Sequence, residues 1–208
     1  MVDVEAPPPL YGLDIETDTT VDGLDPSVGR VLAVAVARAD QVTVIDDADE
    51  AALLTRLDQH LAGLAPGVII TWNGARFDLP YLSTRADRIA IALDLTLQAD
   101  PSRTHPSDRD RNPIDRLGGV RARWGRHRHL DVYRCYRADV GRALGMTCSL
   151  KAVAALVGLA PIEVDAAQVH LLDRARLEAY VASDAACTRE LARRRWANAS
   201  AAIDRVLP

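Results

Sequence analysis

The segment LYGLDIE, which begins at Leu10, constrains the fold more than any other part of the chain. Its residues alternate in character with a period of two, as they do in a β-strand whose successive side chains point to opposite faces of a sheet. Three large apolar side chains share one face, and Asp14 and Glu16 share the other. The segment therefore predicts a strand of a packed sheet whose second face carries two neighbouring carboxylates.

Asp14 and Glu16 admit two interpretations. In a central strand they would be buried side by side, where unpaired carboxylates are costly and repel each other. A divalent cation such as Mg²⁺ would remove that cost, because it binds through carboxylates, waters and substrate phosphates. The alternative is an edge strand with a hydrated face, on which such pairs are common.

The rest of the pattern is typical of an α/β domain. Further strands are expected at residues 31–37 and 42–46, as an antiparallel hairpin, and at 67–70. Asp49 and Ser149 are expected to cap helices. Further helices are expected at 76–87 and from about Asp173 to the mid-190s. Strands followed by helices with interleaved single strands indicate a mixed β-sheet flanked by helices. The 208 residues are expected to form one domain, 1–208, with an N-terminal tail of about eight residues.

Composition excludes several classes of protein. No apolar run approaches the roughly 20 residues that span a bilayer, so no membrane partner is expected. The N-terminus, MVDVEAPPPL, lacks the basic and apolar regions of a signal peptide. Cys135, Cys148 and Cys187 have no metal-binding spacing and are interpreted as reduced thiols, which favours a cytoplasmic protein. Lys151 is the only lysine, and we attribute the excess of arginine to coding bias in a GC-rich genome.

Charge is distributed unevenly along the chain. Residues 1–60 contain 13 acidic residues and 3 arginines, whereas residues 101–142 contain 11 arginines and 5 aspartates. Prolines and glycines interrupt the arginine-rich stretch at about 98–128, which is expected to be a long, partly disordered loop. Such a loop either guides a polyanion to a site or is simply hydrated, and charge alone does not separate the two. The arginines that would contact a substrate are Arg121, Arg123, Arg126 and Arg128.

Two further places put polar side chains where buried surface is expected. Asp78, in the segment WNGARFDLPYL, follows a strand and lies in the first turn of the next helix, where α/β sheets place their sites. It could equally be a helix cap. Tyr180 and Asp184 lie one turn apart on the apolar face of the last helix, although a core tyrosine beside a hydrated aspartate has the same spacing.

These residues together predict one site. Asp14, Glu16, Asp78 and Asp184 can supply four carboxylates from separate parts of the chain. Such a set suits two divalent ions roughly 4 Å apart, which stabilise the attacking and the leaving oxygens in phosphoryl transfer.

At these residues the sequence resembles the DEDD superfamily of 3'-5' exonucleases in its tyrosine-bearing (DEDDy) branch, in particular the proofreading domains of family B DNA polymerases. The first motif of that family, DxE, is matched by DIET. The second, NxxxFDxPYL, is matched by NGARFDLPYL, and the third, YxxxDA, by YVASDA. The first and third motifs are weak alone, but the ordered set is specific and brackets residues 10–190.

The resemblance implies a ribonuclease H-like fold and two divalent ions, Mg²⁺ or Mn²⁺. Asp14 would bridge both ions, Glu16 and Asp184 would complete the site of the ion that binds the attacking water, and Asp78 would hold the hydration shell of the other. Tyr180 would orient or deprotonate that water. Positions that contact the terminal nucleotide in such enzymes are matched by Thr17, Asn73 and Phe77.

The favoured function is a metal-dependent 3'-5' exonuclease that hydrolyses phosphodiester bonds at the 3' end of single-stranded DNA, in repair or in proofreading beside a polymerase. An exoribonuclease is an alternative, since the same carboxylates cleave either backbone. A non-catalytic module that binds nucleic acid or a polymerase is a third, against which the intact set of repelling carboxylates argues. The YxxxD helix disfavours an endonuclease of the ribonuclease H type. His129 and Asp131 could be mistaken for a catalytic pair, but a strand-end or helix-start role is favoured.

Overall fold

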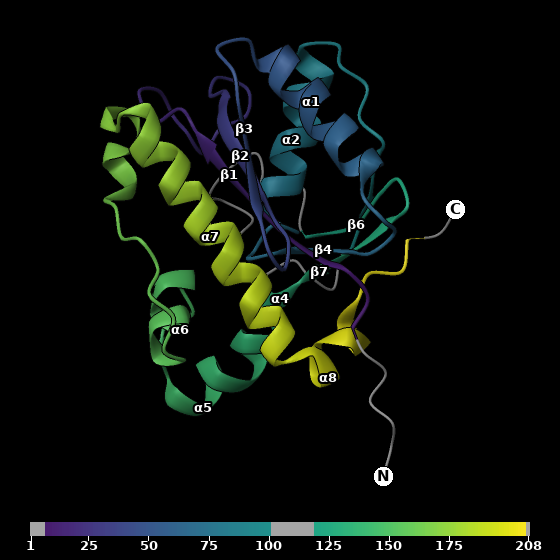
Figure 1. The fold of residues 1–208 in the computed structure, drawn as a ribbon, viewed down its shortest axis with the longest axis vertical. Coiled ribbons are helices and arrows are strands. Elements are labelled where there is room, and N and C mark those ends of the chain that lie inside the picture. The colour runs from purple at the N-terminus through teal and green to yellow at the C-terminus, as the bar shows by residue number, and fades with distance from the viewer. Residues whose placement is uncertain (1–6, 101–118, 207–208) are drawn as a thin grey trace.

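A mixed β-sheet of seven strands runs through the protein, which the computed structural model describes over residues 7–100 and 119–206. The strand order is β3-β2-β1-β4-β7-β6-β5 (Figure 1). Neighbouring strands are antiparallel except β1–β4 and β4–β7, which are parallel. The strands are β1 (Leu10–Thr17), β2 (Val31–Ala37), β3 (Val42–Asp46), β4 (Val68–Thr71), β5 (Leu95–Ala99), β6 (Val120–Trp124) and β7 (His127–Asp131).

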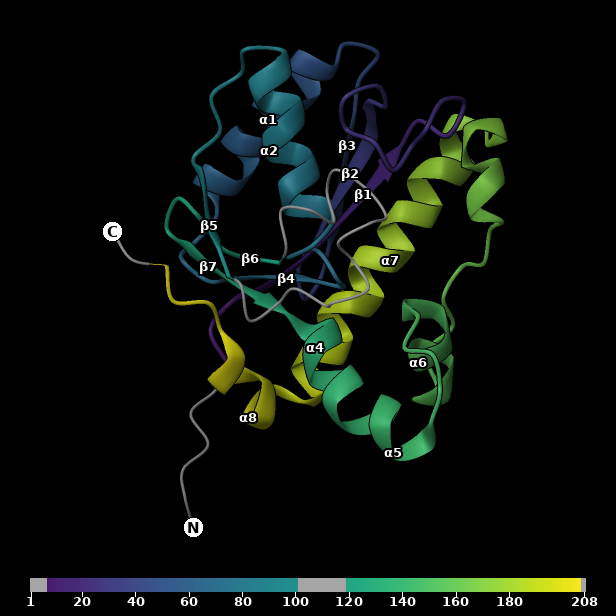
Figure 2. The same ribbon diagram turned by 180° about the vertical axis from the view of Figure 1, so that it is seen from behind.

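Helices cover both faces of the sheet (Figures 1 and 2). One face packs against α1 (Glu50–Gly63) and α2 (Asp78–Arg88), whose leucines meet the odd-numbered apolar side chains of β1 in one core. The other face is crossed by the long helix α7 (Arg174–Arg194). Shorter helices complete that layer: α4 (Val132–Tyr136), α5 (Arg142–Leu144), α6 (Leu150–Leu156) and α8 (Trp196–Ala199). Less regular turns of helix lie at Arg137–Gly141, Ala166–Leu171 and Ser200–Ala202.

β1 is an interior strand, so the edge-strand interpretation of Asp14 and Glu16 is wrong. It pairs with β2 on one side and with β4 on the other. The pairing with β4 ends at Gly12, opposite Ile70, whereas the pairing with β2 continues past Glu16. The two carboxylates therefore project from a part of β1 that extends beyond the end of β4, where another element has room to approach.

The helices predicted after Asp49 and Ser149, and the last helix predicted from about Asp173, are confirmed. The side chain of each cap accepts a hydrogen bond from a backbone N–H in the first turn: Asp49 from Ala51, Ser149 from Ala152, and Asp173 from Arg176. Such caps contribute about 1 kcal/mol each, because they satisfy N–H groups that have no partner within the helix. Among the described residues, no helix is both long and apolar enough to cross a membrane.

A glycine in β1 brings α7 unusually close to the sheet. A Cβ atom added to Gly12 would lie only 2.1 Å from the carbonyl oxygen of Ala185. Any larger residue would push the helix away, so the glycine permits the contact. Because Ala185 follows Asp184 in α7, this close approach holds Asp184 over the carboxylates of β1.

The prediction of a long loop at about 98–128 is wrong for the part of this stretch that the structure describes. β5 continues to Ala99, β6 begins at Val120 and β7 begins at His127, so the arginine-rich stretch contributes two strands to the sheet. The apolar side chains of β6 are buried and alternate with its two arginines, a period-two pattern that the surrounding prolines and glycines obscured. Residues 101–118 and the tail at 1–6 lie outside the described residues.

Candidate active site

Three carboxylates from β1 and α7 meet beyond the end of β4. Asp14 and Glu16 share the Gly12 face of β1, which lies against α7, and Asp184 comes from α7 itself. Each offers one oxygen atom, and these oxygens all lie within 4.8 Å of one another. A divalent cation with ligand distances of about 2.0–2.6 Å can be held by oxygens at this spacing.

Burial and mutual repulsion oppose ionisation of these carboxylates. Burial raises the pKa of Asp14 well above its ordinary value, and the charges of Asp78, Glu16 and Asp184 raise it further. Burial, followed by the charge of Asp184, raises the pKa of Glu16 to about 8. Burial also raises the pKa of Asp184, although Lys151 opposes this. Without a cation the group retains protons near neutral pH, and a bound cation would displace them.

Asp78 joins the carboxylates from a third element. Its charge is the second-largest cause of the raised pKa of Asp14, although it lies outside the close group of three. Burial raises the pKa of Asp78 to about 7, while hydrogen bonds from its own N–H and that of Ile15 lower it. The bond to Ile15 ties the start of α2 to β1. The structure thus brings all four predicted carboxylates to one place, and Asp78 is a candidate ligand for a second cation.

The turn between β4 and α2 sets the position of Asp78. Asn73 adopts a left-handed backbone conformation with φ of 66°, which asparagine tolerates better than most residues. Asp131, at the end of β7, accepts hydrogen bonds from the backbone N–H of Asn73 at 2.9 Å and of Ala75 at 3.3 Å. The strand-end role that we favoured for Asp131 is therefore confirmed.

Tyr180 lies one turn before Asp184 and is 8% exposed. Burial, followed by the charges of Glu16, Asp184 and Asp14, raises the pKa of its phenol further above neutral pH. A phenol that stays protonated can donate a hydrogen bond but is a poor general base. Of the two roles that the resemblance implied, these surroundings favour orientation of the attacking water.

Lys151 also belongs to the site, and the sequence analysis missed it. Its Nζ forms an ion pair with Asp184 and lies 4.3 Å from the centroid of the Tyr180 ring. Coding bias accounts for an excess of arginine, but it does not account for the position of this lysine. One signal was available, because Leu150 and Val153 form the buried stripe of α6 and residue 151 flanks it.

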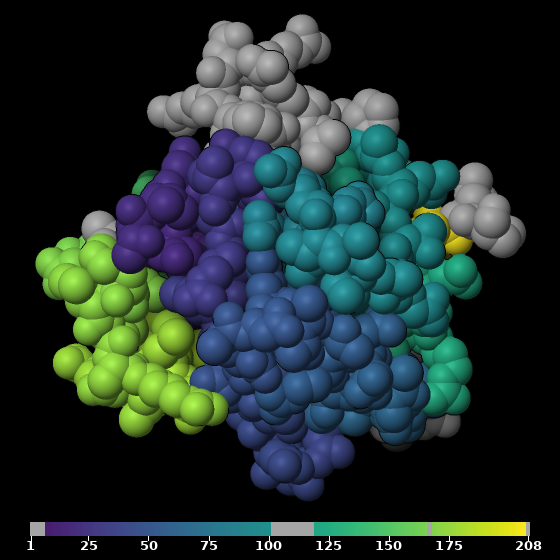
Figure 3. Space-filling model, turned by 90° about the horizontal axis from the view of Figure 1, so that it is seen from above, coloured from purple at the N-terminus to yellow at the C-terminus, as the bar shows by residue number. Residues whose placement is uncertain are grey.

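The residues expected to contact the terminal nucleotide lie next to these carboxylates in the chain. Thr17 ends β1, and its hydroxyl donates to the carbonyl of Gly23 at 2.7 Å, within the segment drawn in purple in Figure 3. In that view the purple segment borders the teal α2 and the lime residues that include the start of α7. Phe77 precedes Asp78, and its ring packs 5.3 Å from that of Tyr81. Contact with a nucleotide stays a prediction for Thr17, Asn73 and Phe77.

The four arginines expected to contact the substrate do not gather at the carboxylates. Arg121 donates to Asp100 at 2.9 Å, and Arg126 donates to backbone carbonyls at the end of α1. Arg123 and Arg128 lie opposite each other in the β6–β7 hairpin, at the end of the sheet where β4 begins. Their contact with the substrate stays a prediction, and any such contact lies away from the carboxylates.

Comparison with known proteins points to one family. A family model described as DNA polymerase family B, exonuclease domain, matches residues 25–140. A DNA polymerase of Thermococcus litoralis is 27% identical over 200 residues, which cover 88% of this chain and 11% of that protein. The catalytic subunit of DNA polymerase epsilon from Candida glabrata is 29% identical over 130 residues, which cover 60% of this chain and 5% of that protein.

A solved structure supports the same fold. The family B DNA polymerase of the hyperthermophilic archaeon Pyrobaculum calidifontis matches with a TM-score of 0.67 and 23% identity over 91% of this chain and 25% of that chain. This confirms the expected ribonuclease H-like α/β fold, a mixed sheet flanked by helices. The chain spans only about a tenth or less of the curated relatives it matches. The family-model match includes Asp78 but not Asp14, Glu16 or Asp184, which the fold brings to it.

Proposed function

The chain belongs to the family of exonuclease domains of family B DNA polymerases, and on this premise we propose that it removes nucleotides from the 3' end of single-stranded DNA with the help of two divalent ions. One observation carries the proposal. Oxygens of Asp14, Glu16 and Asp184 lie within 4.8 Å of one another, and Asp78 is close enough to raise the pKa of Asp14. A protein that only bound nucleic acid would gain nothing from four clustered carboxylates that repel one another.

The donor set suits Mg²⁺ or Mn²⁺, which prefer carboxylate oxygens and keep part of their coordination for water and phosphate. When bound, two such ions stabilise negative charge on the attacking and leaving oxygens of a phosphodiester. Asp14 would be a ligand of both ions, because its carboxylate lies beside those of Glu16 and Asp184 and also feels the charge of Asp78 from α2.

The remaining side chains hold the reactants and balance charge. The phenol of Tyr180 donates a hydrogen bond that aims the attacking water at the phosphorus, because its raised pKa keeps the proton on the oxygen. Lys151 favours the ionised form of Asp184 through their ion pair, against the effect of burial, and its Nζ lies over the tyrosine ring. Lys151 thus contacts both residues that the third motif contributes to the site, Tyr180 and Asp184.

The substrate class follows from the relatives, which are DNA polymerases. We therefore propose a DNA strand with a free 3' end as the substrate and a role in repair or proofreading. A DNA polymerase or a repair protein is the partner beside which such an activity would be used.

Three labelled substrates test the proposal. Single-stranded DNA, duplex DNA and single-stranded RNA of the same sequence, each labelled at the 5' end, are incubated with the protein and Mg²⁺ or Mn²⁺. We expect the single-stranded DNA to shorten in steps of one nucleotide and faster than the other two. Preferred shortening of RNA would assign the chain to the exoribonucleases, and cleavage within a closed circular strand would contradict an exonuclease.

A further inference from the structure

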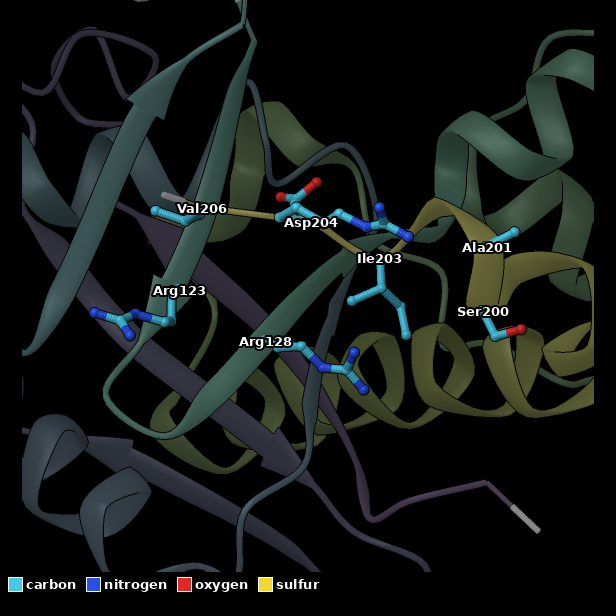
Figure 4. Close-up of a pocket in the computed structure, with 8 residues that line it drawn as sticks. Arg123, Arg128, Ser200, Ala201, Ile203, Asp204 and Val206 are labelled. Atoms are coloured by element: carbon cyan, nitrogen blue, oxygen red, sulfur yellow. The ribbon is translucent and has the colours of Figure 1, made fainter. Parts of the chain in front are cut away.

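A polar pocket lies between the β6–β7 hairpin and the C-terminal segment. Its volume is about 370 Å³, and arginines from three segments line it: Arg123 of β6, Arg128 of β7 and Arg205 near the C-terminus. Ser200 and Ile203 contribute a hydroxyl group and an apolar side chain (Figure 4). None of the four acidic side chains assigned to the active site lines this pocket.

The three arginines outnumber the one carboxylate that lines the pocket, that of Asp204, which contacts His129 and Ala122. All three are exposed, and among residues 7–100 and 119–206 no carboxylate forms an ion pair with any of them. Several other arginines do form ion pairs, as Arg85 does with Glu50 and Arg121 with Asp100. Arg123 and Arg128 are also direct cross-strand partners, an arrangement in which like charges destabilise a sheet. An anionic ligand would relieve that repulsion.

A buried anchor holds the C-terminal side of the pocket in place. The carboxylate of Asp204 lies 2.7 Å from Nδ1 of His129 and accepts a hydrogen bond from the N–H of Ala122 at 2.9 Å. The N–H of Asp204 donates to the carbonyl of His129 at 2.8 Å. Nε2 of the same histidine contacts the hydroxyl of Thr71. Asp204 thus lies between β6 and β7 where the two strands separate. Its contacts fix the backbone position from which the side chain of Arg205 extends.

The directions of the side chains indicate the kind of ligand. Arg123 and Arg128 start from the same face of the hairpin as cross-strand partners, but in Figure 4 their guanidinium groups extend away from each other. One small anion cannot meet two groups that diverge, whereas a chain with phosphates at intervals can meet each in turn. Arginine forms bidentate hydrogen bonds with such phosphates. We propose that Arg123, Arg128 and Arg205 bind the phosphodiester backbone of the nucleic-acid substrate outside the cleavage site.

The position of the pocket fits a strand that also reaches the carboxylates. Gly12, Ile70 and Leu130 are in register across β1, β4 and β7, so Asp14 lies two residues beyond this line and Arg128 two residues before it, on the same face. Four residues along the strands and two strand spacings across separate their Cα atoms by on the order of 16 Å. Because α7 and the shorter helices beside it cover this face, a strand must pass around them and follow a path longer than this distance. A strand of about 4 nucleotides at the cleavage site does not follow that path to the pocket, but one of about 16 nucleotides does.

Binding of strands of two lengths tests the inference, which rests on the proposed exonuclease function. Fluorescence anisotropy is measured with single-stranded DNA of about 4 and about 16 nucleotides, with phosphorothioate linkages at the 3' end to slow cleavage. The pocket variant carries Arg123→Gln, Arg128→Gln and Arg205→Gln. A control variant with the same change in charge carries Arg56→Gln, Arg88→Gln and Arg174→Gln, exposed arginines of α1, α2 and α7. Circular dichroism and melting temperatures establish that both variants are folded.

We expect the pocket variant to bind the longer strand on the order of tenfold more weakly at low salt, and the shorter strand as the wild type does. Its slope of log affinity against log salt for the longer strand should flatten by about 0.7 for each lost phosphate contact. The control variant should keep the wild-type slope.

An unchanged slope in the pocket variant, with cleavage of the 3' end intact, would overturn the inference and leave the proposed function standing. If the pocket variant loses binding to a polyglutamate peptide that the wild type binds, but keeps its binding to DNA, the pocket is assigned to an acidic protein segment. That result would also overturn the inference. A wild-type protein that neither binds nor cuts either strand would refute the proposed function, and the inference with it.

Discussion

We expect the metal-free protein to lose stability as the pH rises from about 5.5 to about 8, and we expect Glu16→Gln to reduce that loss. The pKa of Glu16 is raised from 4.5 to about 8 in the folded protein, first by burial and then by Asp184. Between these two values the folded state holds a proton that the unfolded chain releases. The free energy of unfolding therefore falls as the pH rises through this window.

The size of the effect follows from the shift. Each pKa unit corresponds to about 1.4 kcal/mol, but part of this shift is shared with Asp184 and Asp78, so we expect Glu16 to account for on the order of 2 kcal/mol. Burial lowers the pKa of His60, which gives a pH dependence of the opposite sign. Comparison of the variant with the wild type at each pH removes that contribution, because His60 is present in both.

Urea unfolding in EDTA measures the effect through tryptophan fluorescence at the two pH values. Glu163→Gln, a change at an exposed carboxylate outside the site, serves as the matched control and should follow the wild type. Addition of Mg²⁺ at the higher pH should stabilise the wild type and should stabilise Glu16→Gln less. If the wild type and Glu16→Gln lose stability equally between the two pH values, Glu16 is not held protonated by its neighbours and the electrostatic reasoning is wrong.

The remaining predictions concern the other groups of the site. Asp184→Ala should lose nearly all nuclease activity yet melt in EDTA at the wild-type temperature or above, because repulsion is relieved; a large fall in melting temperature would speak against that repulsion. Tyr180→Phe should reduce turnover by roughly 10- to 1000-fold with little change in substrate affinity, and the pH–rate profile should keep its shape. Turnover at the wild-type rate would make Tyr180 a core residue only, and loss of one limb of the profile would make it a titrating base. Lys151→Gln should lower turnover by about tenfold or more and raise the concentration of Mg²⁺ needed for half-maximal rate, since Asp184 loses the partner that orders it; kinetics identical to those of the wild type would leave Lys151 without a role.

Local patterns in the sequence predicted the part of the fold that carries the site. The alternation in β1 and the caps of α1 and α6 are each contained within a few residues, so they can be recognised without knowledge of distant contacts. The three motifs identified Asp14 within β1, Asp78 at the start of α2 and Asp184 within α7, and the structure brings them together. Prediction succeeded where sequence neighbours determine the structure.

The other half of the sheet was not predicted, because its polar residues are satisfied from far away. β7 carries His127 and His129 in buried positions, which breaks the apolar pattern of a strand. His127 bonds to the carbonyl of Leu61, and His129 lies between Thr71 and Asp204. No local pattern reveals partners that are more than 50 residues distant in the chain. Lys151 was missed for a related reason, since the fold brings it to Asp184, which lies 33 residues later in the chain.

Cleavage of one labelled strand by two proteins tests the central claim most directly. A single-stranded DNA labelled at its 5' end is incubated with wild-type protein or with Asp14→Ala, in Mn²⁺ and in EDTA, and the products are separated on a gel. We expect that only the wild type in Mn²⁺ shortens the strand from its 3' end and produces a ladder of products that differ by one nucleotide. Substantial shortening by Asp14→Ala, or by the wild type in EDTA, would contradict catalysis by ions held at these carboxylates.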